Sequence, residues 1–525
     1  MRLRAAWRWA LVAVSAGLQV MIFPLAGPLS AWHSWLAWIA LAPLLLAILL
    51  PAPDGRMVSP LQAALLGYGC GFLWYLGNCY WIYQTMYLYG GMPRVAAFGI
   101  LILFCLYLGL YHALFGWLLR LAAGKSQRIG LALLTAPFLW VAVELARAHV
   151  TSFPWDQLGM SQIDHPYLTS LAPWTGVYGI SFALAAVSAW IVALALFPNQ
   201  KRLLPIGILC AVIFVMWPRP QQIQVLRPKT AVMLQPNGDV GDQSAWFGGG
   251  FEPQLALLSS LTVRTAATGQ QPDIVIWPES PAPLIQQDSR LQEGAQSLAR
   301  TTGAPLIVGD IAVGDWSRDT GRRAIYNSAS FFTAQGDAAG RYDKMHLVPF
   351  GEYVPFKQLL SFAGSLTEKV GSITPGERRV NFVTGGHSYG VFICYESIFA
   401  DEVRQFAKNG ADVLVNISDD GWYGDTSAPW QHLNMARMRA IENRRWVLRD
   451  TNSGITASID PEGDVVASLP RHEMTALRAP FNYITGTTFY TRHGDWFAYA
   501  CTIIAVAMLG FVRFSSAKHQ AAESR

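Results

Sequence analysis

Long apolar runs dominate the first 217 residues, a polar stretch covers residues 218–491, and one more apolar run follows it. Because a helix needs about 20 apolar residues to cross a hydrocarbon core of about 30 Å, such runs predict membrane-spanning helices. Eight runs of this kind, the seventh of them short, lie near residues 7–23, 30–50, 61–83, 95–119, 130–148, 170–197, 203–217 and 494–513. We expect the first run to be retained as a span, because no small-residue cleavage site for a signal peptide follows it.

The polar stretch has the pattern of a separate α/β domain. Short β-branched runs predict buried strands near 230–234, 273–277, 305–308, 325–332, 389–394, 412–417 and 455–459. Amphipathic stretches predict helices near 251–268, 288–302, 398–409 and 428–443. The chain is therefore expected to have three parts: spans one to seven over 1–217, the polar domain over 218–491, and the eighth span with a tail over 492–525.

Composition and charge agree with this division. Hydrophobic residues make up 52% of the chain and charged residues 14%, whereas soluble proteins carry about 25% charged residues. Residues 1–217 contain 15 Asp, Glu, Lys or Arg side chains, and residues 218–491 contain 52. The net charge is +5, but the basic side chains form no soluble cluster, so no nucleic acid is expected as a partner. The ten histidines show no metal-ligand spacing; we expect packed or interfacial positions for His149, His165 and His432.

Lys and Arg residues in short loops indicate which side of a membrane each loop faces. With a cytoplasmic N-terminus, the cytoplasmic loops and tails hold eleven Lys or Arg residues, and the opposite short loops hold only Arg94 and Arg147. This asymmetry predicts that both termini are cytoplasmic and that the domain at 218–491 is extracytoplasmic. In a bacterium, the protein would be a multi-pass protein of the inner membrane with this domain in the periplasm.

Cys394 is the only cysteine of the polar domain, since the other five lie within or at the edge of apolar runs. An oxidising compartment favours paired cysteines, so a lone one is either buried and inert or kept for its reactivity. The strand predicted at 389–394 ends at Cys394, and a helix is predicted to begin near Ile398. A thiol beside a helix N-terminus has a lowered pKa, and this context favours a reactive nucleophile.

Two other predicted loops carry ionisable residues beside strand ends. Glu279 follows the buried strand at 273–277 within a Trp-Pro-Glu sequence, and Lys344 and Glu352 share one loop. Acyl transfer through a thioester needs a nucleophile, a proton acceptor and a donor for the developing oxyanion. Cys394 would supply the sulfur, Glu279 the base and Lys344 the donor. Glu352 would hold Lys344 or share the proton transfer.

Taken together, these motifs resemble the Glu-Lys-Cys site of the nitrilase superfamily. They are Trp-Pro-Glu at 277–279, Tyr-Asp-Lys-Met-His-Leu-Val-Pro-Phe-Gly-Glu at 342–352 and Cys-Tyr-Glu at 394–396. With eight apolar runs and an extracytoplasmic insert, the whole chain is similar to the apolipoprotein N-acyltransferase family. The resemblance implies an α-helical membrane bundle of eight spans that carries an α/β nitrilase-like domain, an α-β-β-α sandwich.

The resemblance also implies a function. An acyl chain would move from a phospholipid, typically phosphatidylethanolamine, to Cys394 as a thioester, and then to the α-amine of the diacylglyceryl-cysteine of an apolipoprotein. This is a ping-pong reaction, and no metal or organic cofactor is implied. Three residues would be catalytic: Glu279, Lys344 and Cys394. Four would support catalysis or contact substrate: Glu352, Tyr395, Glu396 and Trp246, the last in the loop after the first strand.

Aromatic residues crowd several predicted loops of the domain, and two interpretations stay open. They are either ordinary packing, or arms that dip into the membrane lipids and form an acyl-chain groove, with the triglycine at 248–250 as a hinge. The candidates for the groove are Phe356, Phe362, Trp422 and Tyr423.

Two rival functions also stay open. A membrane-anchored nitrilase-like amidase would use the same three catalytic residues to hydrolyse a small substrate, but it has no evident need for eight spans. A transporter with an extracytoplasmic binding domain would need polar groups near the middle of the membrane, and few ionisable residues lie within the apolar runs.

Overall fold

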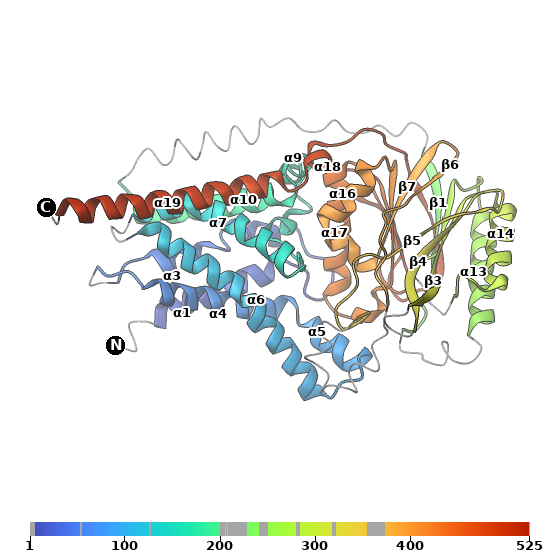
Figure 1. Cartoon of the computed structure of the whole chain (residues 1–525), viewed down its shortest axis with the longest axis horizontal. Coiled ribbons are helices and arrows are strands. Elements are labelled where there is room, and N and C mark those ends of the chain that lie inside the picture. The colour runs from blue at the N-terminus through green and yellow to red at the C-terminus, as the bar shows by residue number, and fades with distance from the viewer. Residues whose placement is uncertain are drawn as a thin grey trace. The chain divides into compact units, whose positions relative to one another are not determined.

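The computed structural model of the chain describes residues 6–52, 55–124, 128–199, 205, 207, 228–240, 250–279, 284–317, 322–353 and 373–523. It contains two compact units, one helical and one built on two β-sheets (Figure 1). The first comprises Met1–Tyr83, Val95–Gln221 and His493–Arg525, and the second comprises Gln84–Arg94 and Gln222–Arg492. The domain boundaries expected near residues 217 and 492 stay predictions, because residues 208–227 lie outside the described ranges.

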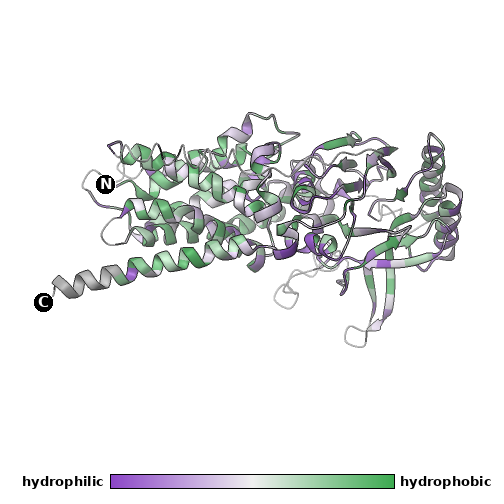
Figure 2. Cartoon of the chain, turned by 90° about the horizontal axis from the view of Figure 1, so that it is seen from above, coloured by the Kyte–Doolittle hydropathy of each residue, from purple (hydrophilic) through white to green (hydrophobic). Residues whose placement is uncertain are grey.

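The helical unit is predominantly hydrophobic (Figure 2). Its longer helices are α1 (Ala6–Met21), α4 (Pro60–Asn78), α6 (Arg94–Ala123), α7 (Ile129–Val150), α10 (Val177–Leu196) and α19 (Trp496–Glu523). Short helices join them: α2 (His33–Leu36), α3 (Ala42–Leu49), α5 (Trp81–Gln84), η3 (Leu158–Gln162), α8 (Pro166–Thr169), α9 (Ala172–Thr175) and α18 (Phe489–His493). Among the described residues, four helices are long and apolar enough to cross a membrane: α6, α7, α10 and the Trp496–Phe514 part of α19.

Two of the predicted apolar runs are divided in the structure. The run at 30–50 forms α2 and α3, and Pro43, which has no N–H to continue a helix, lies in the first turn of α3. The run at 170–197 is interrupted at Gly176, whose φ of 63° separates α9 from α10. The span predicted at 203–217 lies almost entirely outside the described residues.

Small residues let α4 and α6 pack closely. A Cβ atom added at Gly67 of α4 would lie 2.2 Å from the His112 carbonyl oxygen of α6, and one added at Gly116 of α6 would lie 2.4 Å from the Ala63 carbonyl oxygen of α4. Backbone contact of this kind is typical of helices that associate in lipid, where packing replaces the hydrophobic effect.

The second unit contains two six-stranded sheets. The first has the order β12-β1-β2-β3-β4-β5 and consists of β12 (Thr475–Phe481), β1 (Lys229–Gln235), β2 (Ile274–Ile276), β3 (Leu306–Ser317), β4 (Arg322–Phe332) and β5 (Ala338–Asp343). The second has the order β11-β10-β9-β8-β7-β6 and consists of β11 (Val465–Ser468), β10 (Ala457–Ile459), β9 (Val447–Thr451), β8 (Val413–Ser418), β7 (His387–Ile393) and β6 (Asn381–Thr384). β1, β2 and β3 are parallel, as are β7, β8 and β9, and the remaining pairs are antiparallel.

Alternating residues of β1 show how the layers pack. Ala231 and Met233 belong to the core between the sheets, whereas Val232 and Leu234 pack with residues of α13 (Phe251–Ala266) and α14 (Ser289–Thr302). On the other side, α16 (Ala400–Lys408) contacts β7 and α17 (Ala428–Asn443) contacts β9. The result is the α-β-β-α sandwich that the sequence predicts.

All seven predicted strands and all four predicted helices of this domain are present, with shifted ends. The sequence analysis did not predict β5, β6, β9, β11 and β12. Three of them are edge or next-to-edge strands with exposed positions, and β9 buries charged residues that hide its strand pattern.

Candidate active site

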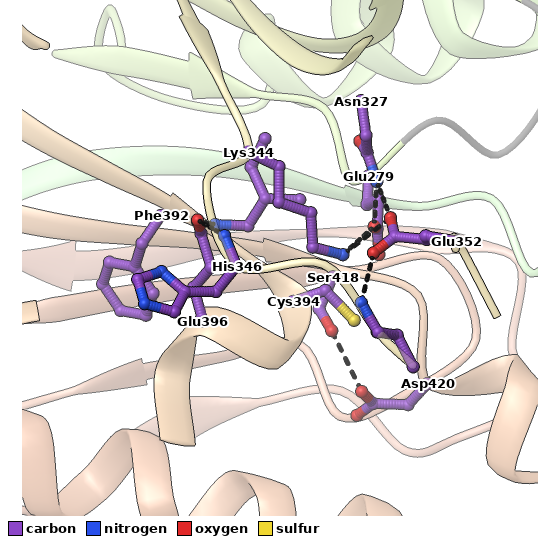
Figure 3. Close-up of polar contacts among 12 residues, drawn as sticks. Glu279, Asn327, Lys344, His346, Glu352, Phe392, Cys394, Glu396, Ser418 and Asp420 are labelled. Atoms are coloured by element: carbon purple, nitrogen blue, oxygen red, sulfur yellow. Dashed lines mark hydrogen bonds and ion pairs between the residues drawn. The ribbon is translucent and has the colours of Figure 1, made fainter. Parts of the chain in front are cut away.

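Cys394 lies where β7 ends, beside the end of the parallel strand β8 (Figure 3). Its φ of 51° is in the left-handed region, which residues other than glycine rarely adopt, and it begins the short 3₁₀ segment η5 (Cys394–Ile398). The Cys394 carbonyl oxygen accepts a hydrogen bond from Nε2 of His432 at 3.0 Å. The surroundings thus hold the cysteine in an unfavourable backbone conformation, as is common at functional sites.

Glu279 lies three residues beyond the end of β2 and is 7% exposed. Its position requires Gly309 on β3, because a Cβ atom there would lie 2.0 Å from the Pro278 carbonyl oxygen. Its Oε1 accepts hydrogen bonds from Asn327 Nδ2 at 2.7 Å and from Lys344 Nζ at 3.2 Å. Its Oε2 is buried and has no hydrogen-bond partner within the part of the chain that the structure describes. One carboxylate oxygen is therefore held in place and the other is uncommitted.

Lys344 follows β5 and is 1% exposed. Its Nζ lies 3.0 Å from Glu352 Oε1 and 3.2 Å from Glu279 Oε1, so one ammonium group joins two carboxylates (Figure 3). Glu352 is fixed from its other oxygen as well, because Oε2 accepts from the Val348 N–H at 2.8 Å. The structure therefore brings together the three catalytic candidates and Glu352.

Asn327 of β4 completes this cluster, and the sequence analysis missed it. Its Nδ2 donates to Glu279 Oε1 at 2.7 Å and to Glu352 Oε1 at 2.8 Å. Its carbonyl oxygen accepts from the Lys344 N–H at 2.9 Å. An amide side chain in the middle of a predicted strand was the available signal, but one sequence does not reveal which distant carboxylates it contacts.

The charges of the cluster set opposite proton states for the lysine and the cysteine. Burial alone would lower the pKa of the Lys344 ammonium, but the carboxylates of Glu279 and Glu352 outweigh it and raise this pKa well above its ordinary value. Burial, together with the negative charge of Glu279, raises the pKa of the Cys394 thiol well above its ordinary value, and Lys344 only partly opposes this.

The predicted lowering of the thiol pKa is therefore wrong. Cys394 is only 5% exposed, and the segment that follows it is a five-residue 3₁₀ helix rather than the N-terminus of a long α-helix. The dipole of so short a segment does not compensate for desolvation and a nearby carboxylate. The resting cysteine is a neutral thiol that needs a base.

Glu396 connects the loop after β5 to the end of β7. Its Oε1 accepts from the Tyr342 hydroxyl at 2.8 Å and from the Met345 N–H at 2.7 Å, and its Oε2 accepts from the Ile393 N–H at 2.7 Å. Burial raises its pKa to about 7 against these hydrogen bonds, which lower it. Because Ile393 and Met345 are the neighbours of Cys394 and Lys344, this fully buried side chain fixes the two loops relative to each other.

Comparisons with known proteins cover nearly the whole chain. Residues 15–190 match the apolipoprotein N-acyltransferase N-terminal domain, and residues 247–483 match the carbon-nitrogen hydrolase family. An apolipoprotein N-acyltransferase of Geobacter metallireducens is 36% identical over 97% of this chain and 96% of its own length. The chain belongs to the apolipoprotein N-acyltransferase family.

Other comparisons agree with the family and with the fold of the second unit. An apolipoprotein N-acyltransferase of Photobacterium profundum is 31% identical over 93% of this chain and 91% of its own length. Among solved structures, a member of branch 10 of the nitrilase superfamily from Saccharomyces cerevisiae is 18% identical over 50% of this chain and 93% of that chain, with a TM-score of 0.39.

The remaining residues that resemblance to apolipoprotein N-acyltransferases singled out lie in different environments. Tyr395 is buried, with its ring edge-on to Phe399 at 5.3 Å. Trp422, in η6 (Asp420–Tyr423), is 45% exposed, whereas Tyr423 is buried with its ring 6.0 Å from that of His432. Trp246, Phe356 and Phe362 lie outside the described residues. Tyr423 is therefore a packed residue, and Trp422 is the aromatic of this pair that reaches the surface.

Residues 84–94 explain how Trp422 is held. This segment belongs to the sandwich unit and includes the π-helix η2 (Thr85–Tyr89). The Thr85 hydroxyl donates to the Trp422 carbonyl oxygen at 3.1 Å, and the Tyr89 ring meets the indole at 6.0 Å and 74°. The loop that carries Trp422 is thus anchored at its backbone, while nearly half of its side chain stays accessible.

In a member of the apolipoprotein N-acyltransferase family, this arrangement supplies what acyl transfer requires. The thiol of Cys394 is the nucleophile, the uncommitted Oε2 of Glu279 is a proton acceptor, and the charged Lys344 ammonium is a donor for an oxyanion. Within the described ranges, no group of three or more His, Cys, Asp or Glu residues is placed to hold a metal ion.

Proposed function

We propose that this chain transfers an acyl chain from a phospholipid to the α-amine of the diacylglyceryl-cysteine at the N-terminus of an apolipoprotein. Phosphatidylethanolamine is the proposed donor. The observation that carries the proposal is the cluster of Glu279, Lys344 and Cys394, with one carboxylate oxygen uncommitted, in a chain whose curated relatives bear this activity in their names.

In the first half-reaction, Cys394 Sγ attacks the ester carbonyl carbon of the phospholipid. Glu279 Oε2 accepts the thiol proton, and the Lys344 ammonium stabilises the negative charge that develops on the carbonyl oxygen. The ester C–O bond then breaks, and Glu279 returns the proton to the departing alkoxide of the lysophospholipid. The acyl chain is left as a thioester on Cys394.

In the second half-reaction, the α-amine of the acceptor attacks the thioester carbonyl carbon. Glu279 accepts a proton from the amine, the C–S bond breaks, and the proton passes to the sulfur of Cys394. An amide forms and the thiol is restored, so one carboxylate serves both halves of a ping-pong reaction.

Asn327, Glu352 and Glu396 support this cycle by holding the catalytic groups. Asn327 and Lys344 fix Oε1 of Glu279, which leaves Oε2 for proton transfer. Glu352 shares Lys344 with Glu279 and keeps the ammonium from forming a closed pair with the base. Tyr395, next to the nucleophile, is proposed to help shape the site.

The proposed location is the bacterial inner membrane, with eight spans, cytoplasmic termini and a periplasmic sandwich at 218–491. Four described helices long enough to span and the eleven-to-two distribution of Lys and Arg support it. Labelling single surface cysteines with a membrane-impermeant reagent in intact spheroplasts tests it. Labelling in the sandwich and protection of the C-terminal tail are expected, and the reverse would contradict the orientation.

An acyl-chain groove is proposed to be lined by Trp422 and Tyr423 together with Trp246, Phe356 and Phe362. The exposure of Trp422 on an anchored loop supports its role. A groove that excludes water would also protect the thioester from hydrolysis.

A two-stage assay tests the proposed function. The full-length chain in detergent is incubated with phosphatidylethanolamine, separated from free lipid, and then given a diacylglyceryl lipopeptide. We expect one round of N-acylation without further donor. Release of free fatty acid or ammonia, with no acylated peptide, would favour the amidase alternative. Substrate uptake into vesicles by a Cys394→Ala variant would favour a transporter.

A further inference from the structure

A second buried polar network lies beneath Cys394, and the proposed acyl transfer does not use it. Ser418 ends β8, Asp420 begins η6, His432 lies in α17 and Arg449 lies in β9, and all four are 0% exposed. Asp420 Oδ1 accepts from the Ser418 hydroxyl at 3.0 Å, and Oδ2 accepts from Arg449 Nη2 at 2.6 Å. Figure 3 shows Ser418 and Asp420 beside the cysteine.

The network reaches Cys394 at two points. His432 Nε2 lies 3.0 Å from the Cys394 carbonyl oxygen, and a carbonyl oxygen only accepts, so Nε2 carries a proton. The Ser418 hydroxyl is hydrogen-bonded to the Cys394 side chain. The network therefore holds both the strained backbone of Cys394 and its sulfur.

Burial and the charge of Arg449 lower the pKa of His432, so the ring is neutral near pH 7. Its Nδ1 then accepts from Arg449 Nη2, 3.0 Å away. Burial of Asp420 is outweighed by the charge of Arg449, and the pKa of this carboxyl lies below its ordinary value. Asp420 is thus a carboxylate that can only accept hydrogen bonds.

A single proton on Ser418 links the carboxylate to the sulfur. While the hydroxyl donates to Asp420, it offers only lone pairs to Cys394, which suits a protonated thiol that donates to it. Once the thiol proton has left, the sulfur is an acceptor and needs the same hydroxyl as a donor. Asp420 and the thiolate therefore compete for one proton.

We propose that Ser418 and Asp420 are positioning residues that set the proton state of the nucleophile: Asp420 holds the Ser418 proton while Cys394 is a thiol, and the hydroxyl turns to the sulfur when Glu279 takes the thiol proton. The inference rests on the proposed role of Cys394 as nucleophile. It gives the Asp420 network a function in the reaction in addition to packing.

The two positions should have opposite effects on the same thiol. Ser418→Ala removes the donor that stabilises the thiolate, so the thiol pKa rises. Asp420→Asn removes the competing acceptor and a nearby negative charge, so the thiol pKa falls. The other ionisable groups that act on the sulfur stay in place in both variants: Glu279, Lys344 and Tyr423. General damage to the fold has no reason to move the pKa in opposite directions.

The test measures alkylation of Cys394 by iodoacetamide from pH 6 to pH 10 in the full-length chain. Peptide mass spectrometry is used because the chain has six cysteines. A shift of one pKa unit changes the rate about tenfold below the pKa. We expect alkylation to become about tenfold slower in Ser418→Ala and about tenfold faster in Asp420→Asn. The matched control is Ser458→Ala, which removes a fully buried hydroxyl of β10 that donates to the Pro480 carbonyl oxygen, and no shift is expected.

Shifts in the same direction, or a Ser418→Ala profile equal to that of Ser458→Ala, would overturn the inference. Asp420→Asn leaves Arg449 without its carboxylate, and if this variant does not fold, the comparison of Ser418→Ala with Ser458→Ala decides alone. Acylation of wild-type Cys394 by phospholipid is measured in parallel. Its absence would count against the proposed function, whereas acylation with unshifted profiles would count against this inference only.

Discussion

Two charged networks meet at one thiol, and they differ in how completely their carboxylates are bonded. In the network of Glu279, Lys344 and Glu352, one ammonium serves two carboxylates, and Glu279 Oε2 has no partner among the described residues. In the other, both oxygens of Asp420 accept hydrogen bonds, and the Asp420 and Arg449 side chains are 0% exposed.

This difference separates chemistry from positioning. An unpaired buried carboxylate oxygen is unfavourable in itself, and it persists where it has a proton to accept. A buried ion pair with good geometry gives little net stability, but the loss of one partner is strongly destabilising. We therefore expect substitutions in the Glu279 network to reduce turnover and substitutions in the Asp420 network to reduce stability first.

The largest expected effect is at the sulfur that both networks contact. Cys394→Ala should abolish acyl-enzyme formation and lipopeptide acylation, because no other group carries the intermediate. Cys394→Ser should be largely inactive, since a hydroxyl has a much higher pKa than a thiol. Acylation at a near wild-type rate by Cys394→Ala would contradict the mechanism.

Glu279→Gln keeps the shape of the side chain and removes the proton acceptor. Loss of a general base typically costs about 10²–10⁴-fold in rate, and we expect a loss in this range for both half-reactions, measured in the two-stage assay. The melting temperature should change little, because Lys344 keeps Glu352. A loss below about threefold would assign Glu279 a structural role and shift attention to Glu352.

Arg449→Met tests the other side of the comparison. The variant leaves Asp420 as a buried carboxylate without its cation, and breaking a buried pair in this way costs about 3–5 kcal/mol. The thermal melting transition of the full-length chain should fall well below that of Glu279→Gln. Equal transitions for the two variants would mean that the networks do not differ in this respect.

Much of the sandwich could be predicted because its central strands have a simple pattern. The β-branched runs of β1, β2, β7 and β8 were recognised. β9 was missed because Arg449 and Asp450 interrupt its apolar pattern, although both are fully buried. Their partners come from other strands and helices, and such pairing across the fold is not visible in one sequence.

The site shows the same limit. Glu279, Lys344 and Cys394 were found because ionisable residues directly after buried strands stand out. Asn327 and Ser418 lie inside strands, where a polar residue is ambiguous until the neighbouring layers are known. The thiol pKa was predicted with the wrong sign because burial and the charge of Glu279 depend on the packed fold.

The smallest expected effect lies at the surface. Trp422→Asp should slow acylation of Cys394 by phospholipid several-fold while leaving alkylation by iodoacetamide unchanged, because the exposed indole would contact lipid and not the thiol. Phe362→Asp is expected to behave in the same way. Equal slowing of both reactions would indicate damage to the site, and no slowing of either would leave Trp422 as a packing residue against Tyr89.

The central claim is that Cys394 carries the acyl chain and that Glu279 is the base that activates it. Mass spectrometry of the Cys394 peptide, after incubation of the full-length chain with phosphatidylethanolamine alone, tests both parts. The account predicts a hydroxylamine-labile acyl adduct on this peptide in the wild-type chain, none in Cys394→Ala, and slow formation in Glu279→Gln. Acylated lipopeptide formed in the second stage without any such adduct in the first would contradict it.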